Sequence, residues 1–165
     1  METGLAIRQA GVTDAPALSS LLMPVFRAGD TYTIDPDISP DDAVAYWTSP
    51  EKTTYLAQRN GQVLGTYYIR PNQGGGGAHV CNCGYITAPE ARGQGIARHM
   101  LDHSLNEAVL QGYRAMQFNF VASTNTRAIE TWKRADFSVV GRLPGAFHHP
   151  TEGYVDALVM YRNLR

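Results

Sequence analysis

The chain has 165 residues, a formal net charge of −1, 44% hydrophobic residues and 18% charged residues. This length fits one domain, residues 1–165, that buries roughly 70% of its unfolded surface. A near-neutral charge without a basic block argues against nucleic acid and membrane surfaces as partners. No apolar run could span a bilayer, the segment METGLAIRQAG lacks a leader pattern, and two cysteines are too few for a disulfide scaffold, so we expect a cytoplasmic protein.

The first half of the chain predicts a strand, two helices and a hairpin. Apolar residues recur at helical spacing after a cap at Thr13 or Asp14, and Ser39 followed by a proline starts a second helix. Asn60-Gly61 is the two-residue turn that most strongly favours a hairpin. The elements are, in order, a strand at 5–10, helices from 13 or 14 to about 28 and from 40 to about 48, and strands at 53–60 and 62–70.

The second half predicts strands that alternate with helices, followed by two closing strands. A strand, a glycine turn, a helix that Gly112 ends and another strand form a parallel unit, with the turn at the carboxyl end of its first strand. The elements are a glycine-rich loop at 71–77, a strand at 78–87, a helix to about 111, a strand at 113–121, a helix at 124–135, and strands at 137–143 and 154–164. The order β-α-α-β-β-β-α-β-α-β-β predicts an α/β (α+β) fold, a mixed central sheet flanked by helices.

The segment PEARGQGIARHML, residues 89–101, places two glycines and two arginines directly before a helix. Free amides at a helix N-terminus with little side-chain bulk form an anion site. The turn lacks the third glycine of a dinucleotide fingerprint, because residue 98 is arginine, and it lacks the lysine of a nucleotide-triphosphate loop. A nucleotide-binding oxidoreductase is therefore disfavoured, and a helix start without any ligand is the alternative for the turn alone.

Two motifs resemble those of the GNAT acetyltransferases. Residues 92–97, RGQGIA, match R-x-x-G-x-A, the family's pyrophosphate-binding pattern, and the lead-in TAPEARGQGIA is similar to the family's approach to this loop. Residues 125–137, NTRAIETWKRADF, resemble the family's N-x-x-A-x-x-x-Y-x-x-x-G-F helix. The element order agrees as well, so the resemblance covers nearly the whole chain. It implies a GNAT-type fold and an N-acetyltransferase with acetyl-CoA as cosubstrate and no metal.

The residues of the glycine turn fit this role. Backbone amides of residues 93–97 can point at a pyrophosphate, and the helix dipole adds about 0.3–1 kcal/mol. Gly95 permits close approach of the backbone, and Arg92 and Arg98 can add charge-assisted hydrogen bonds. The backbone N–H near Thr87 is expected to stabilise the thioester oxyanion. The resemblance gives as cofactor-binding residues Ile86, Thr87, Arg92, Gly93, Gln94, Gly95, Ile96, Ala97, Arg98 and Asn125.

The resemblance has two departures. Trp132 stands where the family usually has a tyrosine, and Asp136 stands where it usually has a glycine. The tyrosine often protonates the departing sulfur of coenzyme A, whereas an indole N–H donates a hydrogen bond but is not a usable acid. The protein therefore either uses another donor or lets the thiolate leave unassisted. A non-catalytic module that binds or senses acyl-CoA is the alternative that this departure favours.

Asn82 and Asn119 interrupt central strands, where amides are unfavourable. In the GNAT family these two strands splay apart and admit the acetyl end of the cofactor. HVCNCGY, FNFVASTN, VGRLP and YVDALVMYRNL also resemble fungal N-acetyltransferases that act on proline analogues such as azetidine-2-carboxylate. That resemblance implies that Asn82 and Asn119 serve the substrate and the reaction, and that the partner is a small-molecule amine such as an amino acid. The alternative is a pair of satisfied structural amides.

Other candidate residues carry weaker signals. His79, Cys81 and Cys83 alternate on one strand, but no second cluster completes a tetrahedral metal site, so we expect no metal and interpret both cysteines as packing residues. His148, His149 and Glu152, in the last long loop, either line the substrate mouth or are solvated turn residues. No carboxylate or histidine stands out as the general base that a neutral attacking amine requires. A peptide or protein N-terminus as acceptor, and a homodimer, remain open.

Overall fold

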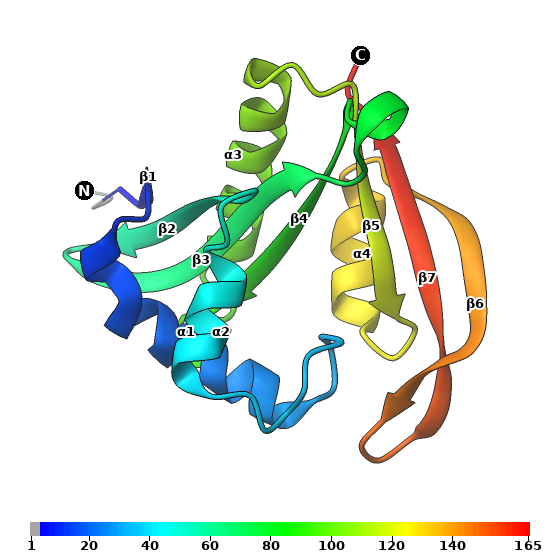
Figure 1. Ribbon diagram of the computed structural model, residues 1–165, viewed down its shortest axis with the longest axis horizontal. Coiled ribbons are helices and arrows are strands. Elements are labelled where there is room, and N and C mark those ends of the chain that lie inside the picture. Colours follow the sequence, from blue (N-terminus) through cyan, green and yellow to red (C-terminus); the bar gives the residue numbers. More distant parts are fainter. Residues whose placement is uncertain (1–3) are drawn as a thin grey trace.

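The computed structural model describes residues 4–165. The first three residues of the segment METGLAIRQAG, in which we expect no leader, lie outside that range. Within it, seven strands form one sheet in the order β1-β2-β3-β4-β5-β7-β6, with helices on both faces (Figure 1). The elements are β1 Ala6–Gln9, α1 Ala15–Ala28, α2 Pro40–Trp47, β2 Thr53–Arg59, β3 Gln62–Pro71, β4 Val80–Thr87, α3 Ile96–Leu110, β5 Ala115–Ala122, α4 Thr126–Arg134, β6 Ser138–His149 and β7 Gly153–Asn163. This order confirms the predicted mixed α/β fold.

Several elements begin and end where their sequence signals predict. Asn60 and Gly61 adopt φ values of 52° and 77°, which the hairpin turn between β2 and β3 requires. The Ser39 hydroxyl accepts a hydrogen bond from the Asp42 N–H at 3.1 Å and so caps α2. Beyond the end of α3, Gly112 has a φ of 89°. Local chemistry is therefore sufficient to set these boundaries.

The expected cap of α1 is correct in position but not in its hydrogen bond. Asp14 occupies the N-cap position of α1, at the end of a short 3-10 turn, but its side chain makes no capping hydrogen bond to the helix. The Asp14 carboxylate instead accepts two hydrogen bonds from the Arg8 guanidinium, each 2.8 Å long. A longer-range ion pair to β1 has replaced the local cap.

The sheet consists of two antiparallel parts joined by a short parallel contact. Strands β1 to β4 pair antiparallel, and β5, β7 and β6 also pair antiparallel. Between β4 and β5 only two residue pairs are in register, Val80 with Ala115 and Cys81 with Met116. Beyond them the two strands diverge, as Figure 1 shows between the green and yellow arrows.

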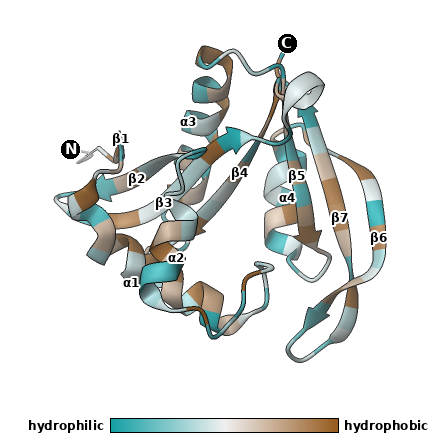
Figure 2. Cartoon of the chain, viewed as in Figure 1, coloured by the Kyte–Doolittle hydropathy of each residue, from teal (hydrophilic) through white to brown (hydrophobic). Residues whose placement is uncertain are grey.

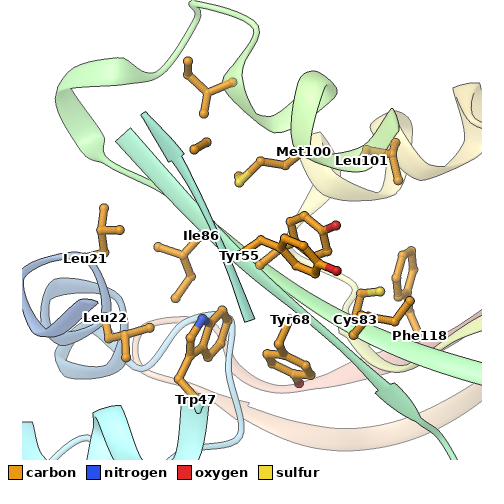
Figure 3. Close-up of a cluster of buried hydrophobic side chains, with 14 of the residues drawn as sticks. Leu21, Leu22, Trp47, Tyr55, Tyr68, Cys83, Ile86, Met100, Leu101 and Phe118 are labelled. Carbon is orange, nitrogen blue, oxygen red and sulfur yellow. The ribbon is translucent and has the colours of Figure 1, made fainter. Parts of the chain in front are cut away.

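The core lies on both faces of the first part of the sheet. Leu22 of α1 and Trp47 of α2 are fully buried against one face, and Met100 of α3 is fully buried against the other (Figure 3). In Figure 2, β4, β5 and β7 carry stretches of hydrophobic residues, whereas β6 includes hydrophilic ones. The helices therefore anchor one side of the divergence between β4 and β5. None of the helices in residues 4–165 is both long and apolar enough to cross a membrane.

The final hairpin is longer than the sequence predicts. The strand expected at 137–143 continues to His149, and only residues 150–152 connect it to β7. His148 and His149 therefore belong to a strand and not to a long loop. His148 stacks on Tyr154 with 4.4 Å between ring centroids, and the His149 ring accepts hydrogen bonds from the backbone N–H groups of the connecting turn. The sequence signal failed here because Pro144 and Gly145 lie in an irregularity, where the register with β7 shifts between Leu143 and Phe147, and the strand resumes its pairing beyond it.

Thr66→Val tests the buried polar link between α2 and the sheet. Trp47 Nε1 donates to the Thr66 hydroxyl at 3.0 Å, and that hydroxyl donates to the Tyr55 carbonyl at 2.8 Å. The substitution leaves the buried indole N–H unpaired, so we expect a loss of about 1–3 kcal/mol in urea denaturation. Thr131→Val, which removes an exposed hydroxyl bonded only to the Arg127 carbonyl, is the control and should change stability by less than about 0.5 kcal/mol. Equal losses in the two variants would contradict the assignment.

Candidate active site

A cleft of about 360 Å³ opens where β4 and β5 diverge. The connection between α1 and α2 lies along one of its walls, and α4 lies along another. Its lining residues are Val25, Thr31, Tyr32, Thr33, Tyr46, Tyr68, Asn82, Cys83, Gly84, Tyr85, Ile86, Thr87, Arg92, Phe118, Asn119, Phe120, Val121, Ala122, Asn125, Ala128 and Trp132. The cleft thus collects segments that are distant in the chain.

The point of divergence is held by a side chain. Directly after the last paired residues, Asn82 Nδ2 donates to the Gln117 carbonyl at 2.9 Å and bridges β4 to β5. On β5, the register with β7 shifts between Phe118 and Val121, so Asn119 lies in a β-bulge. Bulges beside functional sites re-aim side chains, and here the bulge coincides with the cleft.

The edge of β4 presents backbone groups to the cleft. The Val80 carbonyl and the Ala88 N–H bond with the β3 side, and backbone groups of successive strand residues point to opposite edges. Tyr85 and Thr87 therefore direct their N–H and C=O groups toward the space that β5 has left. The backbone of Tyr85 is met there by the Tyr32 hydroxyl, which accepts from its N–H at 3.0 Å and donates to its carbonyl at 2.9 Å.

The glycine turn connects β4 to α3 and leaves backbone amides free. Gly93 and Gly95 both adopt a φ of 79°, a conformation that residues with a side chain rarely take. In the described part of the chain, the N–H groups of residues 93, 95, 96 and 97 have no hydrogen-bond partner. The Gln94 N–H is an exception to the expectation, because it donates to the Ala91 carbonyl. The turn therefore presents a nest of four free amides at the start of a helix, an arrangement suited to an anion.

The structure divides the sequence-predicted site residues into two groups. Six of them line the cleft: Asn82, Ile86, Thr87, Arg92, Asn119 and Asn125. The others form the turn beside it: Gly93, Gln94, Gly95, Ile96, Ala97 and Arg98. Among these, the Ile96 side chain is buried in the core and leaves only its backbone for a ligand, and the Gln94 side chain bonds to Arg59 at 3.1 Å. Asn125, the first residue of the 125–137 motif, and Arg92, at the start of the glycine turn, therefore line the same cleft.

Neither candidate asparagine is enclosed in a core. Asn82 is half-buried, and its bond to Gln117 leaves its Oδ1 without a partner among residues 4–165. Asn119 is exposed, donates to Asn72 Oδ1 at 2.6 Å and accepts from Gln117 Nε2 at 2.9 Å. Both are therefore accessible from the cleft, and Asn82 also has a structural bond.

The groups that line the cleft are nearly all uncharged. Arg92 is its one charged residue among residues 4–165, and no carboxylate or imidazole of that range lines it. Burial raises the pKa of the Cys83 thiol well above its ordinary value, and it also raises the pKa values of Tyr32, Tyr68 and Tyr85. These groups keep their protons at neutral pH. Within the part of the chain that the structure describes, the lining therefore offers neither a carboxylate nor an imidazole as a general base.

The fold is shared with known acetyltransferases. Residues 16–137 match the model of the acetyltransferase (GNAT) family. The chain belongs to the GNAT family. It is therefore an acyltransferase, as a relative in Schizosaccharomyces pombe and one in Kribbella flavida also indicate. It is 30% identical over 148 residues to "N-acetyltransferase aca1" of Schizosaccharomyces pombe, with coverage of 79% of this chain and 71% of that protein.

Solved GNAT structures extend this comparison. A GCN5-related N-acetyltransferase from Kribbella flavida is 39% identical, with a TM-score of 0.91 and coverage of 96% of this chain and 97% of that one. The yncA protein of Salmonella typhimurium, solved with its cofactor acetyl-CoA, has a TM-score of 0.85 and coverage of 98% and 95%. At 19% identity it shows the fold alone.

The geometry explains one departure from the GNAT helix motif. Asp136, at the position that is usually glycine, has a φ of 68°. The Asp136 N–H donates to the Lys133 carbonyl and the Phe137 N–H donates to the Trp132 carbonyl, which is the Schellman pattern at the end of α4. This position needs a left-handed backbone, and aspartate tolerates that conformation better than most residues with a side chain.

The other departure, Trp132, belongs to an aromatic wall. Its ring lies 4.7 Å from Phe118, 5.2 Å from Tyr85 and 6.3 Å from Phe137, measured between centroids. The indole thus fills the cleft wall as a packed ring. Its contribution here is shape, since its N–H is not an acid.

Sequence reasoning missed the tyrosines of the cleft. Tyr32 lies between two helices without a periodic pattern, and Tyr46 and Tyr68 read as ordinary helix and strand residues. Only the folded chain brings them together. In contrast, His148, His149 and Glu152 are not among the described residues that line the cleft, which favours the alternative that they do not border the substrate mouth. The packing interpretation of the cysteines agrees with the structure, since both Cys81 and Cys83 are buried.

Lys52 lies behind the cleft wall and predicts a pH effect. Its Nζ is 3.7 Å from the Tyr46 ring centroid and 4.8 Å from that of Tyr68, with Glu51 and Arg70 nearby. Burial lowers the pKa of Lys52 to about 8, against about 10.4 in an unfolded chain. Between these values the unfolded chain binds more protons, so folding stability rises with pH. The melting temperature of wild type should therefore rise relative to Lys52→Met from about pH 8 to 10, and parallel curves would contradict the lowered pKa.

Proposed function

We propose that this protein is an N-acetyltransferase that transfers the acetyl group of acetyl-CoA to the amine of a small molecule. The observation that carries the proposal is the free edge of β4 beside a nest of four free amides, with both facing one cleft. This combination suits a ligand that has a pyrophosphate at one end and an amide-containing chain behind it. Acetyl-CoA has both parts, and a solved protein of this fold was determined with it.

The cofactor is oriented by charge and by backbone pairing. The pyrophosphate takes the amides of residues 93, 95, 96 and 97, and Arg92 supplies the cationic partner that lines the cleft. The pantetheine arm runs along β4 and bonds to the backbone of Thr87. The thioester then reaches Tyr85, where a backbone N–H can stabilise an oxyanion.

The reaction is direct attack in a ternary complex. The neutral amine nitrogen forms a bond to the thioester carbon, and the adduct collapses with loss of coenzyme A as thiolate. Because no carboxylate or imidazole of residues 4–165 lines the cleft, the amine proton passes to water, to which the amides of Asn82 and Asn119 can offer hydrogen bonds. Trp132 shapes the wall and takes no proton.

The acceptor site favours a small, hydrogen-bonding amine. Asn82, Asn119 and the hydroxyl groups of Thr31 and Tyr46 offer neutral partners, and Phe120 offers an aromatic face. An amino acid or a proline analogue such as azetidine-2-carboxylate is the candidate acceptor that these neutral partners support. A peptide or protein N-terminus, as in the ribosomal-protein acetyltransferases of the same fold, is the second candidate acceptor.

A substrate screen tests the function. Amino acids, their methyl amides, proline analogues, polyamines and short peptides are mixed with acetyl-CoA, and release of free coenzyme A thiol is followed. Turnover of a small amine supports the proposal, and preference for the free acid over its amide would place a carboxylate in recognition. Acetyl-CoA binding without turnover of any amine would instead favour a non-catalytic module.

Gly95→Asp tests the pyrophosphate position, with Gly95→Asn as its matched control. Both side chains tolerate the left-handed φ of 79°, so the backbone cost is similar and only the charge differs. We expect the aspartate to weaken acetyl-CoA binding by at least about tenfold more than the asparagine, because a carboxylate repels the phosphates. Titration calorimetry on both variants measures this. Equal affinities would place the pyrophosphate elsewhere.

Alanine variants test the acceptor side of the cleft. Asn119→Ala should lower kcat/KM for the amine at least about tenfold with little change in melting temperature, since this residue is exposed. Asn82→Ala should lower both, because its amide also ties β4 to β5. Acetyl-CoA affinity should change by less than about threefold in each case. Asn106→Ala, on α3 outside the cleft, is the control. Normal amine kinetics in Asn119→Ala would remove it from the substrate site.

A further inference from the structure

One tyrosine occupies the free edge of β4 from the opposite side to Trp132. Tyr32 comes from the connection between α1 and α2, and its ring packs 5.7 Å from Phe26 and 5.8 Å from Trp47. Its hydroxyl lies between the N–H and the C=O of Tyr85, at 3.0 Å and 2.9 Å. These two packed rings hold the phenol in place, so the contact has a fixed direction.

This hydroxyl stands where a strand would otherwise pair. β4 and β5 are in register only as far as Cys81 and Met116, and the backbone of Tyr85 lies beyond that point. A buried backbone N–H and C=O need partners, and Tyr32 supplies both with a single oxygen. The phenol is therefore the group nearest to any carbonyl oxygen that approaches the Tyr85 N–H.

We propose that Tyr32 is a second oxyanion donor, which acts with the Tyr85 N–H on the carbonyl oxygen of the acetyl thioester. The inference rests on the proposed function and adds a catalytic residue to it. When the thioester oxygen takes the Tyr85 N–H, the Tyr32 O–H turns from the Tyr85 carbonyl to the thioester oxygen. Two donors about 3 Å from the developing charge are the usual requirement for such a site.

The chemical step balances without a proton from Tyr32. The amine nitrogen bonds to the carbonyl carbon, and the π electrons move to the oxygen, which Tyr32 and the Tyr85 N–H stabilise. Collapse re-forms the carbonyl, breaks the C–S bond and releases the thiolate, and the amine proton goes to water. Burial, with smaller contributions from Tyr46 and Cys83, raises the pKa of Tyr32, while its bond to the Tyr85 backbone opposes the shift. A phenol that holds its proton this firmly is suited to donate a hydrogen bond and unsuited to act as an acid.

Tyr32→Phe tests the donor, with Tyr113→Phe as the matched control. The Tyr113 hydroxyl has no hydrogen bond within the described residues and does not line the cleft. We expect Tyr32→Phe to bind acetyl-CoA within about threefold of wild type, to keep KM for the amine and to lose about a hundredfold in kcat. A purely structural role would lower the melting temperature without this split between kcat and KM.

Infrared spectroscopy provides a readout that needs no amine. The carbonyl stretch of bound acetyl-CoA, carbon-13 labelled at the carbonyl, should lie below that of the free thioester in wild type and in Tyr113→Phe. In Tyr32→Phe it should return part of the way toward the free value, because one donor is lost. Tyr32→His, which keeps a ring N–H, should restore part of the shift, and it serves as a second variant if the phenylalanine protein is poorly folded.

The outcomes separate this inference from the proposed function. Failure of wild type to bind acetyl-CoA would overturn the proposed function itself. Wild-type binding with the same carbonyl frequency and the same kcat in Tyr32→Phe would overturn the donor role alone. Tighter acetyl-CoA binding in Tyr32→Phe with an unchanged frequency would also overturn it, because the hydroxyl would then merely compete with the cofactor for the Tyr85 N–H.

Discussion

The loss of pairing between β4 and β5 is the constraint on which the rest of the site depends. Two residue pairs and the bond from Asn82 to the Gln117 carbonyl hold the strands together, and beyond them the backbone of β4 has no strand partner. An unpaired edge inside a protein is costly unless its groups are satisfied. The Tyr32 hydroxyl satisfies one residue in the free protein, and an amide-containing ligand can satisfy the edge more fully. The cleft is thus an interruption of the sheet, maintained by side chains on both faces.

Charge in the cleft is confined to one end. Arg92 and the free amides of the turn lie at the carboxyl end of β4, where we propose that the pyrophosphate binds, and the remaining lining is uncharged. An uncharged lining can form hydrogen bonds to a neutral amine substrate without leaving an unpaired charge in the cleft. This division favours a reaction in which the enzyme binds and orients both reactants and stabilises charge on oxygen, and in which water carries the proton.

Local signals in the sequence predicted most of the architecture, and long-range contacts were beyond it. The Asn60-Gly61 turn, the Ser39 cap and the glycine turn before α3 depend on neighbouring residues, so their positions could be read from the chain. The bond between Tyr32 and Tyr85 joins residues 53 positions apart and has no local signature. The length of β6 depends likewise on its partner β7, which pairs with β6 on both sides of a register shift that looks like a loop in the sequence.

The short parallel contact also has a mechanical consequence. The part of the sheet formed by β5, β7 and β6 is paired to β4 only at Val80 and Cys81, so the two parts are joined at one end and diverge toward the other. From Cys81 to Thr87, β4 is about 20 Å long at the usual strand rise. A rotation of about 5° between the two parts at Cys81 would therefore widen the gap at Thr87 by about 1.7 Å. Beyond the Asn82 amide, the side-chain packing of Tyr85 against Phe118 and Trp132 is what connects the two parts of the sheet, so the width of the mouth depends on these rings rather than on strand pairing.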